Sequence, residues 1–211
     1  MNVVVFDYGA GNVHSACQAL RNVGANVTLT DDAAAVLAAD GLLVPGVGAF
    51  GYVMESFSSR GGPVLVQERL AKGKPVFGIC VGMQIFFEDA FEKGAHKGIG
   101  LLTGSVEKLP FERLPHMGWS VVTAPEKSVM FRGLHDHRFY FVHSYARKAF
   151  MPVETVSGGE MTVMATTGWP EPFISGVEAG PLWGAQFHPE KSGKSGLDLL
   201  RNWISFIDSE R

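Results

Sequence analysis

The sequence is poor in the features that mark extracellular, membrane-spanning and nucleic-acid-binding proteins. It has two cysteines among 211 residues, too few for a disulfide framework. No apolar run approaches the ~18 residues of a membrane span, and Met1–Asp7 has the pattern of a strand rather than a secretory signal. The net charge is −3, and no block of basic residues suits nucleic acid or an anionic membrane as partner. We therefore expect a cytoplasmic protein that acts on a small molecule.

Apolar runs alternate with helical patterns in the first part of the chain. The expected strands are Val3–Phe6, Val27–Leu29, Leu42–Val44 and Pro75–Ile79. The expected helices are Val13–Val23, Asp32–Ala39, Phe50–Ser58 and Pro63–Ala71. Such alternation predicts an α/β fold whose central, mostly parallel sheet is flanked by helices.

The second half of the chain has strand patterns with few helices between them. These expected strands are Leu101–Glu107, Trp119–Thr123, Phe139–Tyr145, Met161–Thr166 and Phe173–Glu178. We interpret them as additional antiparallel strands beside the parallel core. Because 46% of the residues are hydrophobic, enough for one substantial core, we expect a single domain over residues 1–211.

A glycine-flanked cysteine is the first candidate for chemistry. Cys80 lies between Gly78 and Gly82, after an apolar strand pattern and before the helical pattern Met83–Glu88. This arrangement predicts a nucleophile elbow with sulfur in place of a hydroxyl. The glycines permit a tight turn, and the free N–H groups at the start of a helix favour a thiolate.

A histidine and a glutamate provide the groups that such a nucleophile needs. Leu182–Phe187 has the pattern of a strand and leads into His188-Pro189-Glu190. Pro189 favours an extended His188, and in extended chain residues two apart face the same side. We interpret His188 as the base that takes the thiol proton and Glu190 as the carboxylate that orients the imidazole.

These motifs resemble those of the class I, triad-type glutamine amidotransferases, in which Cys80, His188 and Glu190 match the catalytic triad. Five further motifs resemble the amidotransferase subunits of imidazole glycerol phosphate synthases; they are Asp7-Tyr8-Gly9-Ala10-Gly11-Asn12, Pro45-Gly46-Val47-Gly48-Ala49-Phe50-Gly51, Leu114-Pro115-His116-Met117-Gly118-Trp119, Tyr140-Phe141-Val142-His143-Ser144-Tyr145 and His188-Pro189-Glu190-Lys191-Ser192. Anthranilate, GMP and pyridoxal phosphate synthase amidotransferases usually have Pro-Gly-Gly where this chain has Pro45-Gly46-Val47. The resemblance spans the chain and implies the amidotransferase fold.

The resemblance also implies roles for residues around the triad. The candidates for the oxyanion hole are the backbone N–H groups of Val47, Gly48 and Val81. The candidates for binding the α-amino and α-carboxylate groups of glutamine are Gly48, Gln84 and Ser144. The candidates for the partner interface and the ammonia path are Trp119, Tyr140 and Lys191. His116 and His143 are expected in the wall of the site or at the interface.

The expected reaction is hydrolysis of glutamine to glutamate and ammonia, with no cofactor and no metal. By resemblance, the partner in a heterodimer is the (β/α)8 cyclase subunit of imidazole glycerol phosphate synthase. That subunit would use the ammonia to make imidazole glycerol phosphate and an aminoimidazole carboxamide ribonucleotide in histidine biosynthesis. Coupling between the subunits implies a low basal rate in isolation.

Three other interpretations stay open. The chain could be the glutaminase subunit of another amidotransferase, or a stand-alone cysteine hydrolase with the same triad. It could also be a binding module, because Gly9-Ala10-Gly11 with Asp31 superficially resembles a dinucleotide fingerprint. His14 stands where that fingerprint needs its third glycine, which disfavours cofactor binding. His135-Asp136-His137 is more typical of a solvated turn than of a metal site.

Overall fold

The structure, a computed structural model, describes residues 1–155, 162–168 and 171–210. Within these residues the main sheet has seven strands. In spatial order they are β11 (Val163–Gly168), β12 (Pro172–Ala179), β13 (Leu182–Ala185), β4 (Val76–Cys80), β3 (Gly41–Gly46), β1 (Asn2–Phe6) and β2 (Asn26–Thr30). The strands from β13 to β2 pair in parallel, whereas β11 and β12 add antiparallel pairs at one end. The predicted α/β class, with antiparallel strands contributed by the second half, is confirmed.

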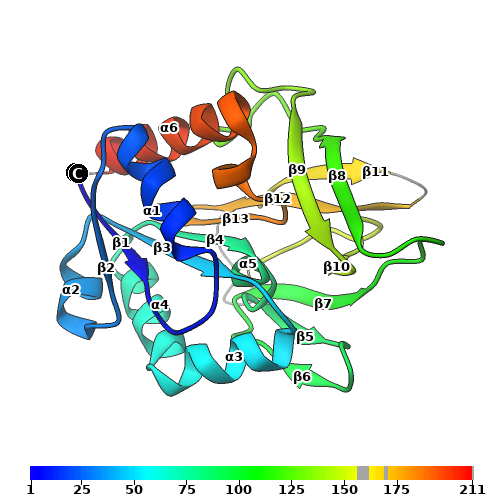
Figure 1. The fold of residues 1–211 in the computed structure, drawn as a ribbon, viewed down its shortest axis with the longest axis horizontal. Helices are drawn as coiled ribbons and strands as arrows, with labels where there is room; N and C mark the ends of the chain where they lie inside the picture. The colour runs from blue at the N-terminus through cyan, green and yellow to red at the C-terminus, as the bar shows by residue number, and fades with distance from the viewer. Residues whose placement is uncertain (156–161, 169–170, 211) are drawn as a thin grey trace.

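Helices cover both faces of the main sheet (Figure 1). They are α1 (Val13–Asn22), α2 (Ala33–Ala38), α3 (Phe50–Ser59), α4 (Gly62–Ala71), α5 (Val81–Gln84), α6 (Gly193–Ser209) and the 3-10 helix η1 (Pro189–Lys191). Helices α1 and α6 lie on one side of the sheet, and α2, α3 and α4 lie on the other (Figure 1). No helix among the described residues is long and apolar enough to cross a membrane.

Two smaller sheets flank the main one. The first contains, in spatial order, β10 (Tyr145–Arg147), β7 (Leu102–Lys108), β5 (Phe87–Ala90) and β6 (His96–Lys97). The second is the antiparallel pair β8 (His116–Val121) and β9 (Arg138–His143), which lies beside the β11–β12 end of the main sheet (Figure 1).

Three local expectations need correction. The helix predicted over Met83–Glu88 is wrong, because α5 ends after one turn and the chain pairs with β7 as β5. The strand predicted over Leu182–Phe187 ends at Ala185. Part of the strand predicted over Met161–Thr166 is present in β11, but Met161 lies outside the described residues.

The two central strands end side by side at one edge of the sheet. Every residue of β3 and β4 is buried, and Gly46 at the end of β3 pairs with Cys80 at the end of β4. Open α/β sheets place their sites at the carboxyl ends of such strands. The core therefore fixes Cys80 at the edge where a substrate can reach it.

Candidate active site

Cys80 is at a sharp strand-to-helix turn with left-handed backbone. Its φ of 55° and ψ of −115° form a conformation that L residues rarely adopt. Close approach of neighbouring backbone explains the flanking glycine: a Cβ on Gly82 would lie 2.0 Å from the carbonyl oxygen of Val44. The structure therefore has, at Cys80, the tight elbow expected from sequence.

A cavity of about 290 Å³ opens in front of the Cys80 sulfur. It is lined by Val47, Gly48, Cys80, Val81, Gln84, Glu92, Pro115, Val142, His143, Ser144 and Tyr145. The structure thus brings together, around one cavity, Cys80 and every residue that the sequence suggested for the oxyanion hole and for glutamine. These residues come from the ends of β3, β4 and β9, which are far apart in the sequence.

Tyr8 supports the end of β3, next to this cavity. Its buried hydroxyl donates a short hydrogen bond to the carbonyl oxygen of Pro45. Burial, followed by the charge of Cys80, raises the pKa of Tyr8 well above its usual range, so the phenol stays protonated and can donate. The Asp7-Tyr8-Gly9 motif therefore supports the end of β3, which leads into Val47 and Gly48.

His188 and Glu190 form a buried pair next to Cys80. The imidazole Nδ1 lies 2.8 Å from Glu190 Oε1, and both side chains are almost fully buried. His188 has extended backbone, as Pro189 predicts, but Glu190 is in η1 rather than in a strand. The 3-10 turn, not strand alternation, brings the carboxylate back to the imidazole.

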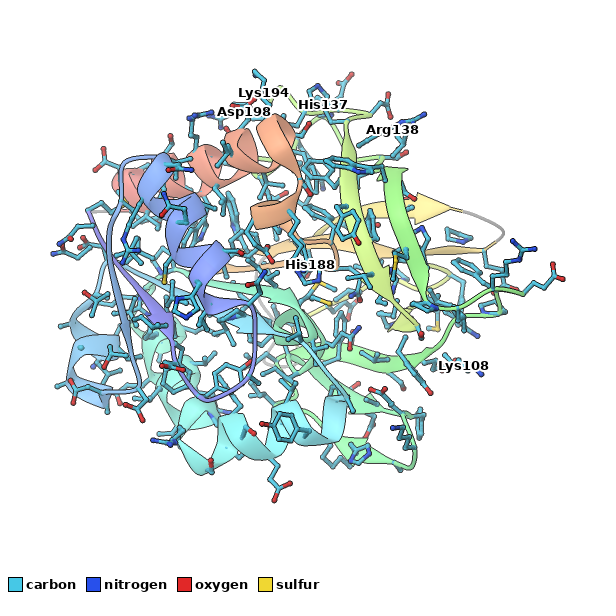
Figure 2. All side chains as sticks on the ribbon, viewed as in Figure 1. Lys108, His137, Arg138, His188, Lys194 and Asp198 are labelled. Atoms are coloured by element: carbon cyan, nitrogen blue, oxygen red, sulfur yellow. The ribbon has the colours of Figure 1, made fainter. Side chains whose placement is uncertain are left out.

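Hydrogen bonds to β9 anchor the backbone of this pair. The N–H of His188 donates to the carbonyl oxygen of Tyr140 at 2.9 Å. Ser192 Oγ donates to the carbonyl oxygen of His188 at 2.6 Å and accepts from the N–H of Tyr140 at 2.9 Å. Figure 2 shows His188 in the interior of the molecule, whereas Lys194 and Asp198 of α6 lie at its outer edge. The imidazole therefore has little freedom to move.

The charge state of His188 depends on its neighbours. Burial alone lowers the pKa of His188, but the Cys80 sulfur and the Glu190 carboxylate outweigh burial and raise it to about 10. The Nε2 atom is buried and meets no partner of hydrogen-bonding geometry among the described residues. The imidazole is thus cationic and lies close to Cys80. Its Nε2–H donates no hydrogen bond within the described residues.

Two polar residues of the site were not expected from sequence. Gln186 is fully buried, and its Nε2 lies 3.6 Å from Cys80 Sγ. Glu92 lines the cavity, and one of its oxygens accepts from the N–H of Phe50 at 2.7 Å, at the start of α3. Gln186 stands beside the His188 motif, but nothing in a single sequence shows that its side chain reaches a sulfur on another strand.

The residues expected at a partner interface lie outside the cavity. Trp119 is 52% exposed on the outer face of β8, and its ring contacts that of Tyr140 at 6.2 Å between centroids. Lys191 is exposed on η1. Trp119 also lines a larger neighbouring cavity of about 800 Å³, together with His116 and Met117. An ordinary core position for Trp119 is therefore ruled out.

No metal centre is present among the residues that the structure describes, since no group of three or more His, Cys, Asp or Glu side chains gathers there. His137, from the His135-Asp136-His137 sequence, is exposed and its Nδ1 contacts Ser195 Oγ at 3.1 Å.

Comparisons with known proteins show the family to which the chain belongs. The family model for "Glutamine amidotransferase class-I" matches residues 4–205. The imidazole glycerol phosphate synthase HisH subunit of Leifsonia xyli is 48% identical, over 97% of this chain and 98% of the relative. The HisH subunit of Streptomyces avermitilis is 50% identical, over 97% and 96%.

Solved structures show the same fold at low identity. A crystal structure of a glutamine amidotransferase matches with a TM-score of 0.73 at 19% identity, covering 98% of each chain. The structure of PurLQS from Thermotoga maritima matches with a TM-score of 0.66 at 20% identity, covering 97% of this chain and 98% of that one. The chain belongs to the class-I glutamine amidotransferases and, within them, to the family of imidazole glycerol phosphate synthase HisH subunits.

Proposed function

We propose that this chain is the glutaminase subunit of an imidazole glycerol phosphate synthase and that Cys80, His188 and Glu190 are its catalytic triad. One observation carries the assignment: a cysteine on a strained elbow faces a cavity beside a buried histidine–carboxylate pair. The full-length identity to HisH subunits supports the choice of this synthase over other amidotransferases.

The first chemical step is attack of the Cys80 thiolate on the carboxamide carbon of glutamine. The carbonyl oxygen becomes an oxyanion, for which backbone N–H groups of Val47, Gly48 and Val81 are the available donors around the cavity. Loss of one such donor typically costs about 3 kcal/mol of transition-state stabilisation.

The charge state of His188 fits both halves of the reaction. Because its pKa is raised to about 10, the imidazolium is present at neutral pH and can protonate the amide nitrogen of the tetrahedral intermediate, so that the C–N bond breaks and neutral ammonia leaves. Thioester formation removes the sulfur's negative charge, and the imidazole has given up its proton. It can then act as the base that activates water to release glutamate, while Glu190 keeps its orientation.

Substrate recognition at the far end of the cavity involves Gly48, Gln84 and Ser144. The role of Gln84 is mainly to position its neighbours. Its amide Nε2 already donates to the carbonyl oxygen of Tyr145 and to Gln186 Oε1. We add Glu92 to this set, since a carboxylate at the wall of the cavity suits the α-ammonium group of an amino acid.

Ammonia released to water at neutral pH is mostly protonated and non-nucleophilic, so it must reach its acceptor without equilibrating with solvent. We propose that its receiver is a (β/α)8 cyclase subunit, which forms imidazole glycerol phosphate. The proposed contacts with this subunit are Trp119, Tyr140 and Lys191, and the exposed indole of Trp119 supports this.

We also propose a cytoplasmic location and a single domain over residues 1–211.

The two cysteines give a matched test of the nucleophile. We expect Cys80→Ser to abolish glutamate release from glutamine in the complex. Cys17 is a buried residue of α1, and Cys17→Ser should retain glutamate release. Both variants are expected to bind the cyclase subunit, which is checked by co-elution in size-exclusion chromatography. Normal turnover in Cys80→Ser would remove the proposed nucleophile.

A further inference from the structure

A chain of hydrogen bonds begins on the inner face of β8, at Ser120. Ser120 Oγ lies 2.9 Å from Nε2 of His116, four residues earlier on the same face of the strand. His116 Nδ1 lies 3.2 Å from Nε2 of His143, its cross-strand partner on β9. His143 Nδ1 lies 3.0 Å from the carbonyl oxygen of Tyr145. Polar groups of two strands are thus joined to the backbone beside Ser144.

The same carbonyl oxygen continues the chain toward the nucleophile. Gln84 Nε2 donates to the Tyr145 oxygen at 2.9 Å and to Gln186 Oε1 at 2.9 Å. Gln186 Nε2 in turn approaches Cys80 Sγ at 3.6 Å. The links run without a gap from Ser120 to the sulfur, and we name this set of residues the relay: Ser120, His116, His143, Tyr145, Gln84, Gln186 and Cys80.

Donor and acceptor roles in the histidine part of the relay follow from its fixed end. The Tyr145 carbonyl can only accept, so His143 Nδ1 carries a proton. Burial lowers the pKa of His143 to about 3, and burial also lowers that of His116. Both rings are therefore neutral, which leaves Nε2 of His143 as an acceptor for His116 Nδ1–H and Nε2 of His116 as an acceptor for the Ser120 hydroxyl.

Packing restricts the relay to one arrangement. Gln186 is 0%, Gln84 3% and His143 6% exposed, so a broken link leaves a polar group away from water. The ring of His116 is enclosed by aromatic neighbours, with Phe141 at 5.2 Å and Phe173 at 5.6 Å between centroids. His143 lines the smaller cavity and His116 the larger one, so the pair forms the wall between them.

We propose that Gln186 is a positioning residue for the Cys80 sulfur and that the relay, through the His116–His143 pair, fixes Gln186 from β8. The proposal rests on the role proposed for Cys80 and deepens it. The N–H donor of Gln186 meets the sulfur from the segment that precedes His188, so it stabilises and aims the charged form. The relay therefore links the inner face of β8 to the nucleophile, and the outer face of the same strand carries the exposed Met117 and Trp119.

The test is a double-mutant cycle on the alkylation rate of Cys80 by iodoacetamide in the full chain, in a Cys17→Ala background that leaves one thiol. We expect Gln186→Met, which keeps the volume and loses the donor, to slow alkylation about tenfold. We expect His116→Phe, which suits the aromatic surroundings, to slow it about threefold. The double variant should be no slower than Gln186→Met alone, because both changes break one connected unit.

Two control variants separate positioning from general destabilisation, and a third variant is held in reserve for the cycle. Ser128→Ala removes two buried hydrogen bonds outside the relay, to Glu178 and from the N–H of Phe131, and should leave the rate within about twofold. His116→Asn keeps an amide donor near the position of Nδ1 and should recover most of the rate, which a merely structural role would not predict. If Gln186→Met does not fold, Gln84→Met breaks the adjacent link and replaces it in the cycle.

Wild-type rates in both single variants would overturn the proposal, and so would a double variant slowed by the product of the two factors, about thirtyfold. Alkylation needs neither glutamine nor a cyclase subunit. Failure of the proposed glutaminase function would therefore appear as absent turnover with the cycle intact, and failure of the relay as additive effects with turnover intact.

Discussion

At the scale of single residues, Cys80 combines the proposed role of nucleophile with backbone strain. Its positive φ is a conformation in which a Cβ meets steric repulsion, and the surrounding strands β3 and β4 enforce it. The same residue lines the cavity. Stability and reactivity therefore compete at this one position.

This strain predicts that glycine is more stable than alanine at position 80, the reverse of their order inside a helix. Cys80→Gly should have a free energy of unfolding about 1 kcal/mol higher than Cys80→Ala, because glycine relieves the positive φ. The matched pair at Cys17, inside α1, should show the opposite order, since glycine is the poorer helix former. Chemical denaturation of the four variants measures both differences. Alanine equal to or better than glycine at position 80 would contradict the strain.

His143 predicts how stability depends on pH. Its pKa falls from an ordinary 6.5 to about 3 on folding, mainly through burial. Between these values the unfolded chain binds a proton that the folded chain does not, so the free energy of unfolding falls with falling pH by up to about 1.4 kcal/mol per unit. His143→Phe should reduce this slope, and His137→Phe, at an exposed position, should not. Equal slopes in both variants, measured by denaturation from pH 7 to pH 4.5, would contradict the assignment.

At the scale of elements, the site depends on the contact between α5 and the end of β3. Gly82 lies in α5, where alanine would ordinarily favour a helix. A Cβ there would meet the Val44 carbonyl carbon at 3.0 Å and its oxygen at 2.0 Å, and backbone atoms cannot move aside as a side chain can. The close approach, not helix propensity, selects glycine.

We expect Gly82→Ala to lower the free energy of unfolding by about 3 kcal/mol and to abolish glutaminase activity. Gly61→Ala is the control, because Gly61 has a φ of 70° but a Cβ added there would meet no atom within 4 Å. It should cost only about 1 kcal/mol and keep activity. Thermal or urea denaturation compares the two, and equal costs would show that the close approach to Val44 does not constrain position 82.

Local sequence patterns predicted helices and strands, and a local motif predicted the contact between His188 and Glu190. Two short motifs could be found in this way, because their residues are close in sequence. They are Cys80 with its flanking glycines, and His188 with Glu190. The helix expected after Cys80 failed because Phe86 and Phe87 are fully buried and the chain joins β7, so tertiary pairing overrides the local pattern. Gln186 and Glu92 were missed because their roles depend on contacts between distant segments.

At the scale of the whole molecule, the site is built where the main sheet and the two small sheets meet. The main sheet provides Cys80 and leads into Gln186, and β9 leads into the Ser144 side of the cavity. The β8–β9 pair also presents the exposed Met117 and Trp119 on its outer face. The proposed catalytic cavity and the proposed partner surface therefore share one pair of strands.

Trp119 tests that partner surface. Because its side chain is half exposed, Trp119→Ala should change the free energy of unfolding by less than about 1 kcal/mol. Its loss should weaken binding to the cyclase subunit by about tenfold or more, as expected for an aromatic anchor. Tyr52→Ala, on α3 and 58% exposed, is the control and should leave binding unchanged. Calorimetric titration with the cyclase subunit measures the affinity of each variant. Loss of cooperative unfolding in Trp119→Ala would show instead that Trp119 has a structural role.

The central claim is that Cys80 is the nucleophile of a glutaminase that works with a cyclase subunit. The most direct measurement is glutamate release from glutamine by this chain, first alone and then with the cyclase subunit plus its nucleotide ligand. We predict a low rate alone and a rise of orders of magnitude in the complex, lost in Cys80→Ser. A full rate in isolation with no response to the partner would indicate a stand-alone hydrolase and contradict the claim, and so would silence under both conditions.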